Sequence, residues 1–100
     1  MKHQDKIKKS INLFGPREEL IKVCEELGEL QSEVFKAVKG KENREKILEE
    51  LADVYFVLGY IKEIYHISDE EMDENMNAKV QDFEKVLKEK ERDIYPEPEY

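Results

Sequence analysis

The chain of 100 residues contains a single cysteine, Cys24, so it cannot form an intrachain disulfide. Helical spacing places Cys24 between Leu20 and Leu27, which predicts a buried, unreactive thiol. No stretch approaches the ~18 to 20 apolar residues that a membrane-spanning helix needs. The first residues also lack the apolar core of a signal sequence. We therefore expect a cytoplasmic protein in a reducing compartment, with no membrane among its partners.

Basic residues are in deficit. The 17 Lys and Arg residues stand against 25 Asp and Glu, which gives a formal net charge of −8. Nucleic-acid polymers bind basic surfaces, and anionic membranes attract positive charge, so the composition argues against both as partners. The charged fraction of 42% is typical of long amphipathic helices.

Threonine is absent, and so is the alternation of Val and Ile that marks strands. Hydrophobic residues recur with helical periodicity instead. Start and stop signals divide the chain into about four helices. These signals are Gly15-Pro16, Gly40, Asn43 and a capping box over residues 68–71. Short connections between long helices predict antiparallel neighbours. The expected fold class is therefore all-α, an antiparallel helical bundle.

One hundred residues fit a single domain. We place this domain at residues 1–93, followed by a flexible C-terminal tail at 94–100, where prolines prevent a helix from continuing. A chain this short, with 39% hydrophobic residues, buries only a modest core. We expect self-association to complete the bundle.

Two near-copies of an acidic motif dominate the sequence. Residues 25–30 read EELGEL and residues 49–54 read EELADV. Each copy contains an acidic pair separated by three residues, and the four acids are Glu26, Glu29, Glu50 and Asp53. Residues at this spacing share one face of a helix. Two neighbouring helices would thus gather four carboxylates around one point, where cations or protons must neutralise them.

At about 100° per residue, both acidic pairs lie beside the apolar stripe of their helix and not opposite it. The stripes consist of Leu20, Val23, Cys24, Leu27, Leu30, Val34 and Val38, and of Ile47, Leu51, Val54, Tyr55, Leu58 and Tyr65. Glu25 and Glu49 point elsewhere and are expected to face solvent. Asp53 precedes residues 54–61, which are apolar around the whole helix, so we expect Asp53 to be partly buried. A single pair of this kind is common in charged helices, and it is the repeated offset that favours a four-acid site.

Four carboxylates without histidine favour Mg²⁺, with Mn²⁺ as an alternative. His3 and His66 lie outside both motifs, which argues against zinc and against a di-iron site. Mg²⁺ held by carboxylates usually completes its shell with water and phosphate oxygens, so a phosphate ester or anhydride is the expected substrate. Candidate substrate-binding residues are Lys22, Asn77 and Lys79, although each lysine alone is more often a solvated side chain.

The paired motif resembles the signature of the MazG-like all-α nucleoside triphosphate pyrophosphohydrolase superfamily, E-x-x-E followed by E-x-x-D. The resemblance covers about residues 16–83, and it implies assembly into a homodimer or homotetramer. It implies that the four acids are both the Mg²⁺ ligands and the catalytic residues, with one glutamate helping to activate water. Asn77-Ala78-Lys79 resembles a short motif of the family, Asn-x-Lys or Asn-x-Arg, that contacts the substrate. The chain departs from MazG proper at Gln81 and Asp82, near the position where MazG carries a pair of arginines.

The resemblance implies a Mg²⁺-dependent enzyme that cleaves a (d)NTP, or a related nucleotide, to a nucleoside monophosphate and pyrophosphate, in a house-cleaning role. Two alternatives stay open. One is a phosphoribosyl-ATP pyrophosphohydrolase of histidine biosynthesis. The other is a non-catalytic helical interaction module whose acids are only surface charge.

Overall fold

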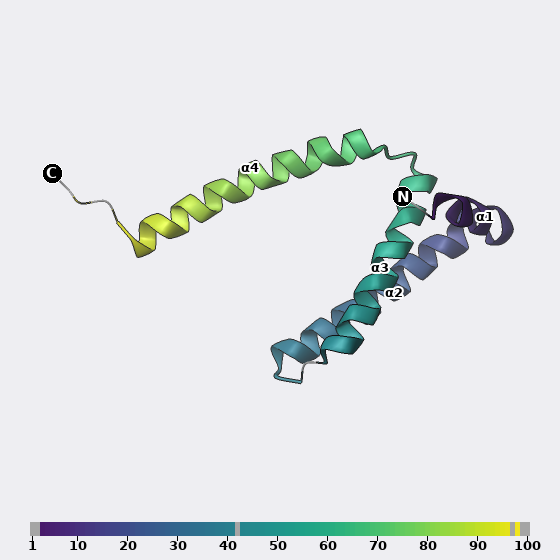
Figure 1. The fold of residues 1–100 in the computed structure, drawn as a ribbon, viewed down its shortest axis with the longest axis horizontal. Coiled ribbons are helices and arrows are strands. Elements are labelled where there is room, and N and C mark those ends of the chain that lie inside the picture. Colours follow the sequence, from purple (N-terminus) through teal and green to yellow (C-terminus); the bar gives the residue numbers. More distant parts are fainter. Residues whose placement is uncertain (1–2, 42, 97, 99–100) are drawn as a thin grey trace. The chain divides into compact units, whose positions relative to one another are not determined.

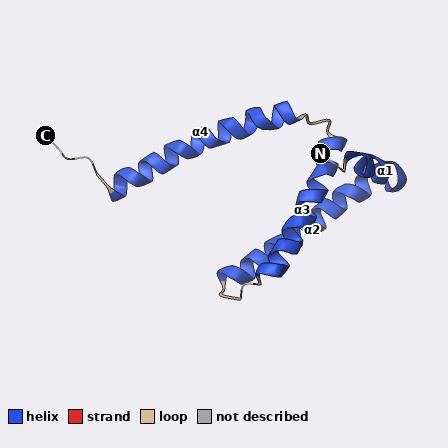
Figure 2. Ribbon diagram, in the orientation of Figure 1, coloured by secondary structure: helices blue, strands red, loops and turns tan. Residues whose placement is uncertain are grey.

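The computed structural model describes residues 3–41, 43–96 and 98, and it contains four helices with no strand in that part of the chain (Figures 1 and 2). The helices are α1 (Gln4–Phe14), α2 (Pro16–Val38), α3 (Arg44–Ile64) and α4 (Asp69–Ile94). The predicted all-α class and the number of helices are confirmed. The chain divides into two compact units, Met1–Ile67 and Ser68–Tyr100.

The turn between α1 and α2 follows from two residues. Gly15 adopts φ 90°, a conformation that L side chains rarely take, and its N–H donates to the carbonyl of Ile11 at 2.8 Å. Pro16 then occupies the first helical position, where its missing N–H costs nothing. The predicted helix boundary at Gly15-Pro16 is confirmed.

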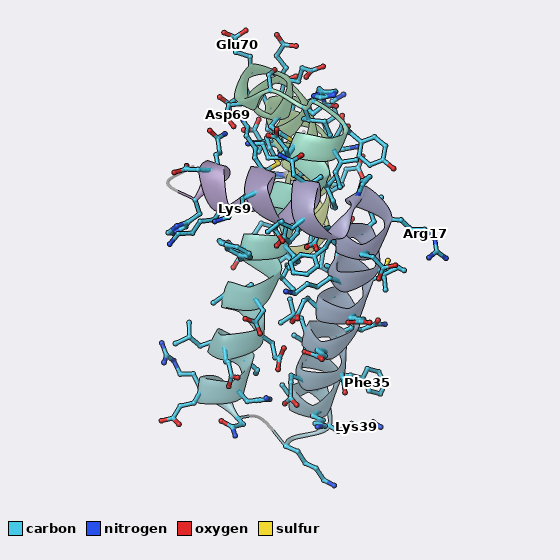
Figure 3. The ribbon with its side chains drawn as sticks, turned by 90° about the vertical axis from the view of Figure 1, so that its right-hand side faces the viewer. Lys9, Arg17, Phe35, Lys39, Asp69 and Glu70 are labelled. Carbon is cyan, nitrogen blue, oxygen red and sulfur yellow. The ribbon has the colours of Figure 1, made fainter. Side chains whose placement is uncertain are left out.

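The connection between α2 and α3 is as short as expected. Gly40, at φ 83°, closes α2 by donating its N–H to the carbonyl of Ala37 at 3.0 Å, and the N–H of Lys41 reaches the carbonyl of Lys36 at 2.9 Å. Asn43 begins α3 by accepting a hydrogen bond from the backbone N–H of Lys46 at 3.2 Å. This tight connection turns α3 back along α2 as an antiparallel neighbour (Figures 1 and 3).

The end of α3 repeats this closing pattern with an unusual residue. His66 takes the left-handed conformation, at φ 53°, and the N–H of Ile67 reaches the carbonyl of Lys62 at 2.9 Å. The predicted capping box follows at once, with the Ser68 hydroxyl accepting from the Glu71 N–H at 3.1 Å and the Glu71 carboxylate accepting from the Ser68 N–H at 2.9 Å. These contacts set the start of α4.

The interface between α2 and α3 alternates steps of three and four residues, as in coiled coils. In α2 its buried or half-buried members are Glu19, Val23, Glu26, Leu30, Glu33 and Ala37. In α3 they are Ile47, Glu50, Val54, Val57, Ile61 and Ile64. Four of these twelve positions are glutamates, so the hairpin buries acidic side chains along with aliphatic ones.

The apolar core lies where α1 crosses the two helices, away from the loop that joins them (Figure 3). Ile7 of α1 packs there with Val23, Val57 and Tyr60, and each of the four is at most 3% exposed. The Tyr60 hydroxyl donates to the Ser10 hydroxyl at 3.3 Å, which satisfies the polar end of a buried aromatic ring. This cluster fixes α1 and holds one end of the hairpin rigid.

The predicted apolar stripes do lie along one face of each helix, but the prediction that this face forms the core of the chain is largely wrong. The residues that directly follow each interface residue in the sequence form a second row along both helices, and most of them remain exposed in the chain. We call it the outer stripe, and its apolar members are Leu20, Leu27, Val34, Val38, Leu48, Leu51, Tyr55, Leu58 and Tyr65. Cys24 belongs to it and is exposed, so the predicted buried thiol is wrong. The reason is geometric, because two antiparallel helices cover one face of each other and leave the adjacent face open.

Helix α4 forms a unit of its own, and none of its residues is buried. Its apolar side chains are exposed, including Met72, Met76, Val80, Phe83 and Leu87. Ile94 closes the helix, so the predicted tail begins at its last residue. Residues 97, 99 and 100 of that tail lie outside the described part, and the proposed flexibility stays a prediction.

Candidate metal centre

The four predicted acids meet. Glu26 and Glu29 from α2, with Glu50 and Asp53 from α3, each offer one carboxylate oxygen, and these oxygens all lie within 4.8 Å of one another. The spacing of three residues puts each pair on one face of its helix, and the antiparallel hairpin brings the two faces together. The predicted gathering of the four side chains is confirmed.

The cluster has an inner and an outer half. Glu26 and Glu50 occupy the α2–α3 interface, where Glu50 is 4% exposed and Glu26 is half-buried. Glu29 and Asp53 lie at its edge and are exposed. The predicted burial of Asp53 is therefore wrong within the chain. Its neighbour Val54 takes the interface position, and the run that follows keeps an open side, where Tyr55 remains 68% exposed.

Two oxygens in the inner half have no partner. The Oε2 atoms of Glu26 and Glu50 are buried and make no hydrogen bond to the residues that the structure describes. Leaving a charged oxygen buried without a hydrogen bond costs about 1 to 3 kcal/mol or more. Such a carboxylate is stable only if a proton or a cation compensates it.

The negative charges of the cluster also act on its outer half. A hydrogen bond with the Glu50 carboxyl raises the pKa of Glu29 above its usual value of 4.5, and the negative charges of Glu26 and Glu50 raise it further. Glu29 therefore keeps its proton to a higher pH than an isolated glutamate does. A divalent cation would relieve the same repulsion without the proton.

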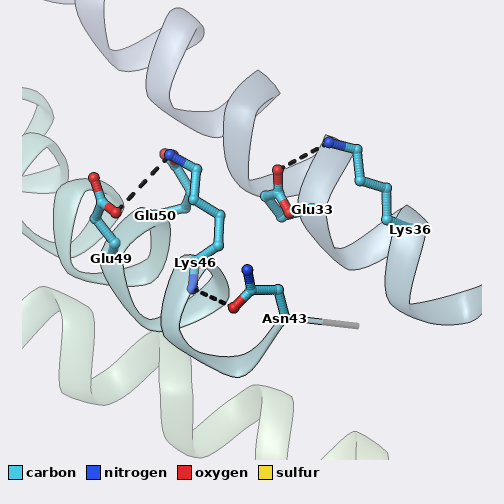
Figure 4. A network of polar contacts seen from close by, with 6 residues as sticks. All are labelled: Glu33, Lys36, Asn43, Lys46, Glu49 and Glu50. Atoms are coloured by element: carbon cyan, nitrogen blue, oxygen red, sulfur yellow. Dashed lines mark hydrogen bonds and ion pairs between the residues drawn. The ribbon is translucent and has the colours of Figure 1, made fainter. Parts of the chain in front are cut away.

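Lys46 supplies a cation that sequence reasoning missed (Figure 4). Its Nζ lies 3.1 Å from Oε1 of Glu50 and 3.9 Å from Oε2 of Glu49. The hydrogen bond with Glu50 is the main cause that raises the pKa of Lys46, and the charges of Glu49 and Glu50 add to it. The sequence contained one indication of this ion pair, the four-residue spacing from Lys46 to Glu50.

Glu33 extends the line of acids along α2. It is half-buried, one turn beyond Glu29, and pairs with Lys36 at 3.1 Å (Figure 4). This pair lies outside the four-acid cluster. It shows how an acid at the same interface is neutralised when a lysine of its own helix reaches it.

Glu19 is a second residue that sequence reasoning missed. Its place in the first turn of α2 accounts for an acid there, since negative charge is favoured at that end of a helix, but it does not account for the burial of the side chain. The side chain is 5% exposed, and its Oε2 is buried without a partner among the described residues. The signal was its interface register, seven residues before Glu26. Glu19 is not a member of the four-acid cluster.

The predicted substrate-binding residues are all exposed. Lys22 lies on α2, one turn before Glu26. Asn77 and Lys79 lie on α4, which the structure describes as a separate unit, so their role at the cluster stays a prediction. His3 and His66 are exposed and do not contribute to the cluster, as expected.

The donor set suits a hard cation. Oxygens on opposite sides of Mg²⁺ lie at most about 4.2 Å apart, so the four carboxylates need to draw in by about half an ångström. The unpartnered oxygens of Glu26 and Glu50 are the donors that such an ion would satisfy. No nitrogen or sulfur atom belongs to the group, which favours Mg²⁺ or Mn²⁺ over zinc.

No helix in the described residues combines the length and the apolar character needed to cross a bilayer. Comparisons of the chain with protein-family models, with curated proteins and with solved structures return no match.

Proposed function

We propose that the protein is a Mg²⁺-dependent nucleotide pyrophosphohydrolase and that the four-acid cluster is its catalytic centre. The observation that carries the proposal is the convergence of four carboxylates, two of which have a buried oxygen without a partner. A purely structural hairpin gains nothing from such oxygens, because aliphatic side chains at the same positions would pack without a desolvation cost.

Glu26, Glu29, Glu50 and Asp53 would hold the cation. When bound, Mg²⁺ supplies positive charge to the phosphate oxygens of the substrate. One of the glutamates accepts the proton of the attacking water. The oxygen of that water bonds to the α-phosphorus, and the bond to the bridging oxygen breaks. The products are a nucleoside monophosphate and pyrophosphate, as the resemblance of the paired motif to MazG-like enzymes implies.

In this proposal Lys22 on α2 adds positive charge at the substrate. The resemblance adds two residues of α4, Lys79 as a further positive charge and Asn77 as a neutral hydrogen-bonding group. Gln81 and Asp82 stand near the position where MazG proper carries a pair of arginines, so fewer positively charged residues neutralise the phosphates. We propose a house-cleaning role on a (d)NTP or a related nucleotide.

The outer stripe supports self-association. It runs along both α2 and α3 and keeps large apolar side chains in water, with Val38 at 78% and Tyr65 at 62% exposure. Two hairpins that pair through this stripe form a four-helix bundle, which buries the apolar surface that one chain cannot cover.

A nucleotide panel tests the function. Purified protein is incubated with canonical and noncanonical nucleoside triphosphates and with phosphoribosyl-ATP, in Mg²⁺ or in chelator, and pyrophosphate is measured. The proposal predicts Mg²⁺-dependent release from at least one nucleotide and loss of release in Asp53→Asn. The exposed acid Glu25 lies on α2 outside the cluster and gives a matched control, so Glu25→Gln should retain activity. No release from any nucleotide would favour the non-catalytic interaction module.

A further inference from the structure

Lys46 stands where local helix energetics do not favour a lysine. It is the third residue of α3, and the Asn43 cap holds its backbone N–H at 3.2 Å. The first turn of a helix favours negative charge, so a cation there is unfavourable. The order of Lys before Glu at four residues is also weaker than the reverse order. The contact with Glu50 must therefore be explained by the cluster itself.

Glu50 needs a counter-charge. It is 4% exposed, and Lys46 neutralises one of its oxygens, Oε1, from a distance of 3.1 Å. Oε2 of the same carboxylate keeps no partner. With three further acids close by, this single ammonium group leaves most of the negative charge of the cluster uncompensated.

Lys46 also has a second acid within reach. Its Nζ lies 3.9 Å from Oε2 of Glu49, whose side chain is 65% exposed (Figure 4). The ammonium group thus lies between an inward acid of the cluster and an outward acid in solvent. A small rotation of the flexible lysine side chain exchanges one acid for the other, because four rotatable bonds determine the position of Nζ relative to the backbone.

We propose that Lys46 is a built-in counter-ion, which occupies Glu50 until a divalent cation enters the cluster and then moves to Glu49. The inference rests on the proposed metal centre and adds a residue that sets its affinity. Lys46 stabilises the metal-free hairpin, and the entering cation must displace its charge from Glu50. The site is thereby kept folded without metal, at the expense of weaker metal binding.

Removing this charge should have two opposite effects. The Lys46→Met variant keeps the apolar stem of the side chain but leaves Glu50 without a counter-ion, so the metal-free protein should melt at a lower temperature. The same variant should bind a divalent cation about tenfold more tightly, since a positive charge several ångströms from the ion no longer repels it.

The test is a calorimetric titration of the full chain with Mn²⁺ alone, with melting curves recorded with and without the ion. Lys36→Met is the matched control, because Lys36 pairs with Glu33 at the same 3.1 Å but outside the cluster. We expect tighter binding and a larger Mn²⁺-induced rise in melting temperature for Lys46→Met, and wild-type values for Lys36→Met.

The exchange between the two acids has its own readout. Glu49→Gln should weaken Mn²⁺ binding in the wild-type background and have a smaller effect in the Lys46→Met background, because the displaced lysine then needs no new partner. If Lys46→Met is poorly folded without metal, Glu49→Gln in the wild-type background tests the exchange by itself, since it leaves all four ligands in place. Unchanged Mn²⁺ binding by that single variant would contradict the exchange.

Several results would overturn the inference. Equal or weaker Mn²⁺ binding by Lys46→Met contradicts it while leaving the metal centre intact. Equal effects of Glu49→Gln in both backgrounds contradict the exchange of partners. Failure of the wild-type protein to bind Mn²⁺ at all contradicts the proposed function, and with it this inference.

Discussion

Glu26 of α2 and Glu50 of α3 belong to one cluster of four carboxylates, and each has a side-chain oxygen that is buried without a hydrogen-bond partner. The two residues occupy positions in a helix interface that aliphatic side chains would normally fill. Their burial separates this cluster from ordinary acidic surface charge, and it is the physical basis of the account.

The raised pKa of Glu29 predicts how stability changes with pH. Between its usual value of 4.5 and its higher folded value, the folded protein keeps a proton that the unfolded chain has lost. This contribution to stability is therefore complete below pH 4.5 and disappears as pH rises through the folded pKa. In chelator, the free energy of unfolding of wild type should fall over this window, and the fall should be smaller in Glu29→Gln.

Denaturant titrations at a series of pH values measure the effect. Glu25→Gln, an exposed acid on the same helix but outside the cluster, should keep the wild-type pH dependence. Identical pH profiles for wild type and Glu29→Gln would show that Glu29 does not hold the proton.

Glu19 should oppose stability. Its buried, unpartnered oxygen costs about 1 to 3 kcal/mol, while its charge near the start of α2 returns about 0.3 to 1 kcal/mol. The Glu19→Met variant fills the interface position without that oxygen and should raise the free energy of unfolding by about 1 kcal/mol. The exposed neighbour Glu18, replaced in the same way, should give no gain. A loss of stability in Glu19→Met would mean that the carboxylate has a favourable partner.

His66 should be replaceable by glycine with a gain. At φ 53° the backbone of His66 is strained in a way that a glycine backbone is not. A glycine, Gly40, already ends α2 in the same left-handed conformation. His66→Gly should raise the free energy of unfolding by about 0.5 to 1 kcal/mol, measured by denaturant titration. Gly40→Ala is the opposite control and should destabilise. No atoms crowd Gly40, so its effect comes from the backbone alone.

Assembly through the outer stripe predicts a species heavier than the 11.9 kDa chain in sedimentation. A charge placed within the stripe on both helices, in the double variant Leu27→Glu and Leu58→Glu, should reduce it to monomer, because a buried carboxylate at an apolar interface is costly. Ser32→Glu adds charge at an exposed polar position and should leave the assembly unchanged. A wild-type protein that sediments as monomer would refute self-association.

The helix boundaries could be predicted because they depend on local chemistry. The backbone freedom of Gly15, the side-chain oxygen of Asn43 and the capping box of Ser68 each act within a few residues. The meeting of the two acidic pairs could also be predicted, since it needs only helical spacing and an antiparallel neighbour.

The buried face could not be predicted in the same way. Hydrophobic periodicity favours the face of Leu27 and Leu51, whereas the hairpin buries the face one residue earlier, which contains Glu26 and Glu50. Each helix has two adjacent faces that carry apolar residues, and sequence periodicity does not tell which face is buried within the chain. Lys46 was missed for the same reason. Its role as a counter-charge depends on the burial of Glu50, which the sequence does not reveal.

The central claim is that the four carboxylates bind one hard cation together. Electron paramagnetic resonance of free Mn²⁺ measures this directly, since the signal of the aqueous ion decreases when the protein binds it. The account predicts binding by the wild-type protein, competition by Mg²⁺, and strong loss of binding in both Glu50→Gln and Asp53→Asn. An unchanged Mn²⁺ signal with wild type, or binding by these two variants as tight as that of wild type, would contradict it.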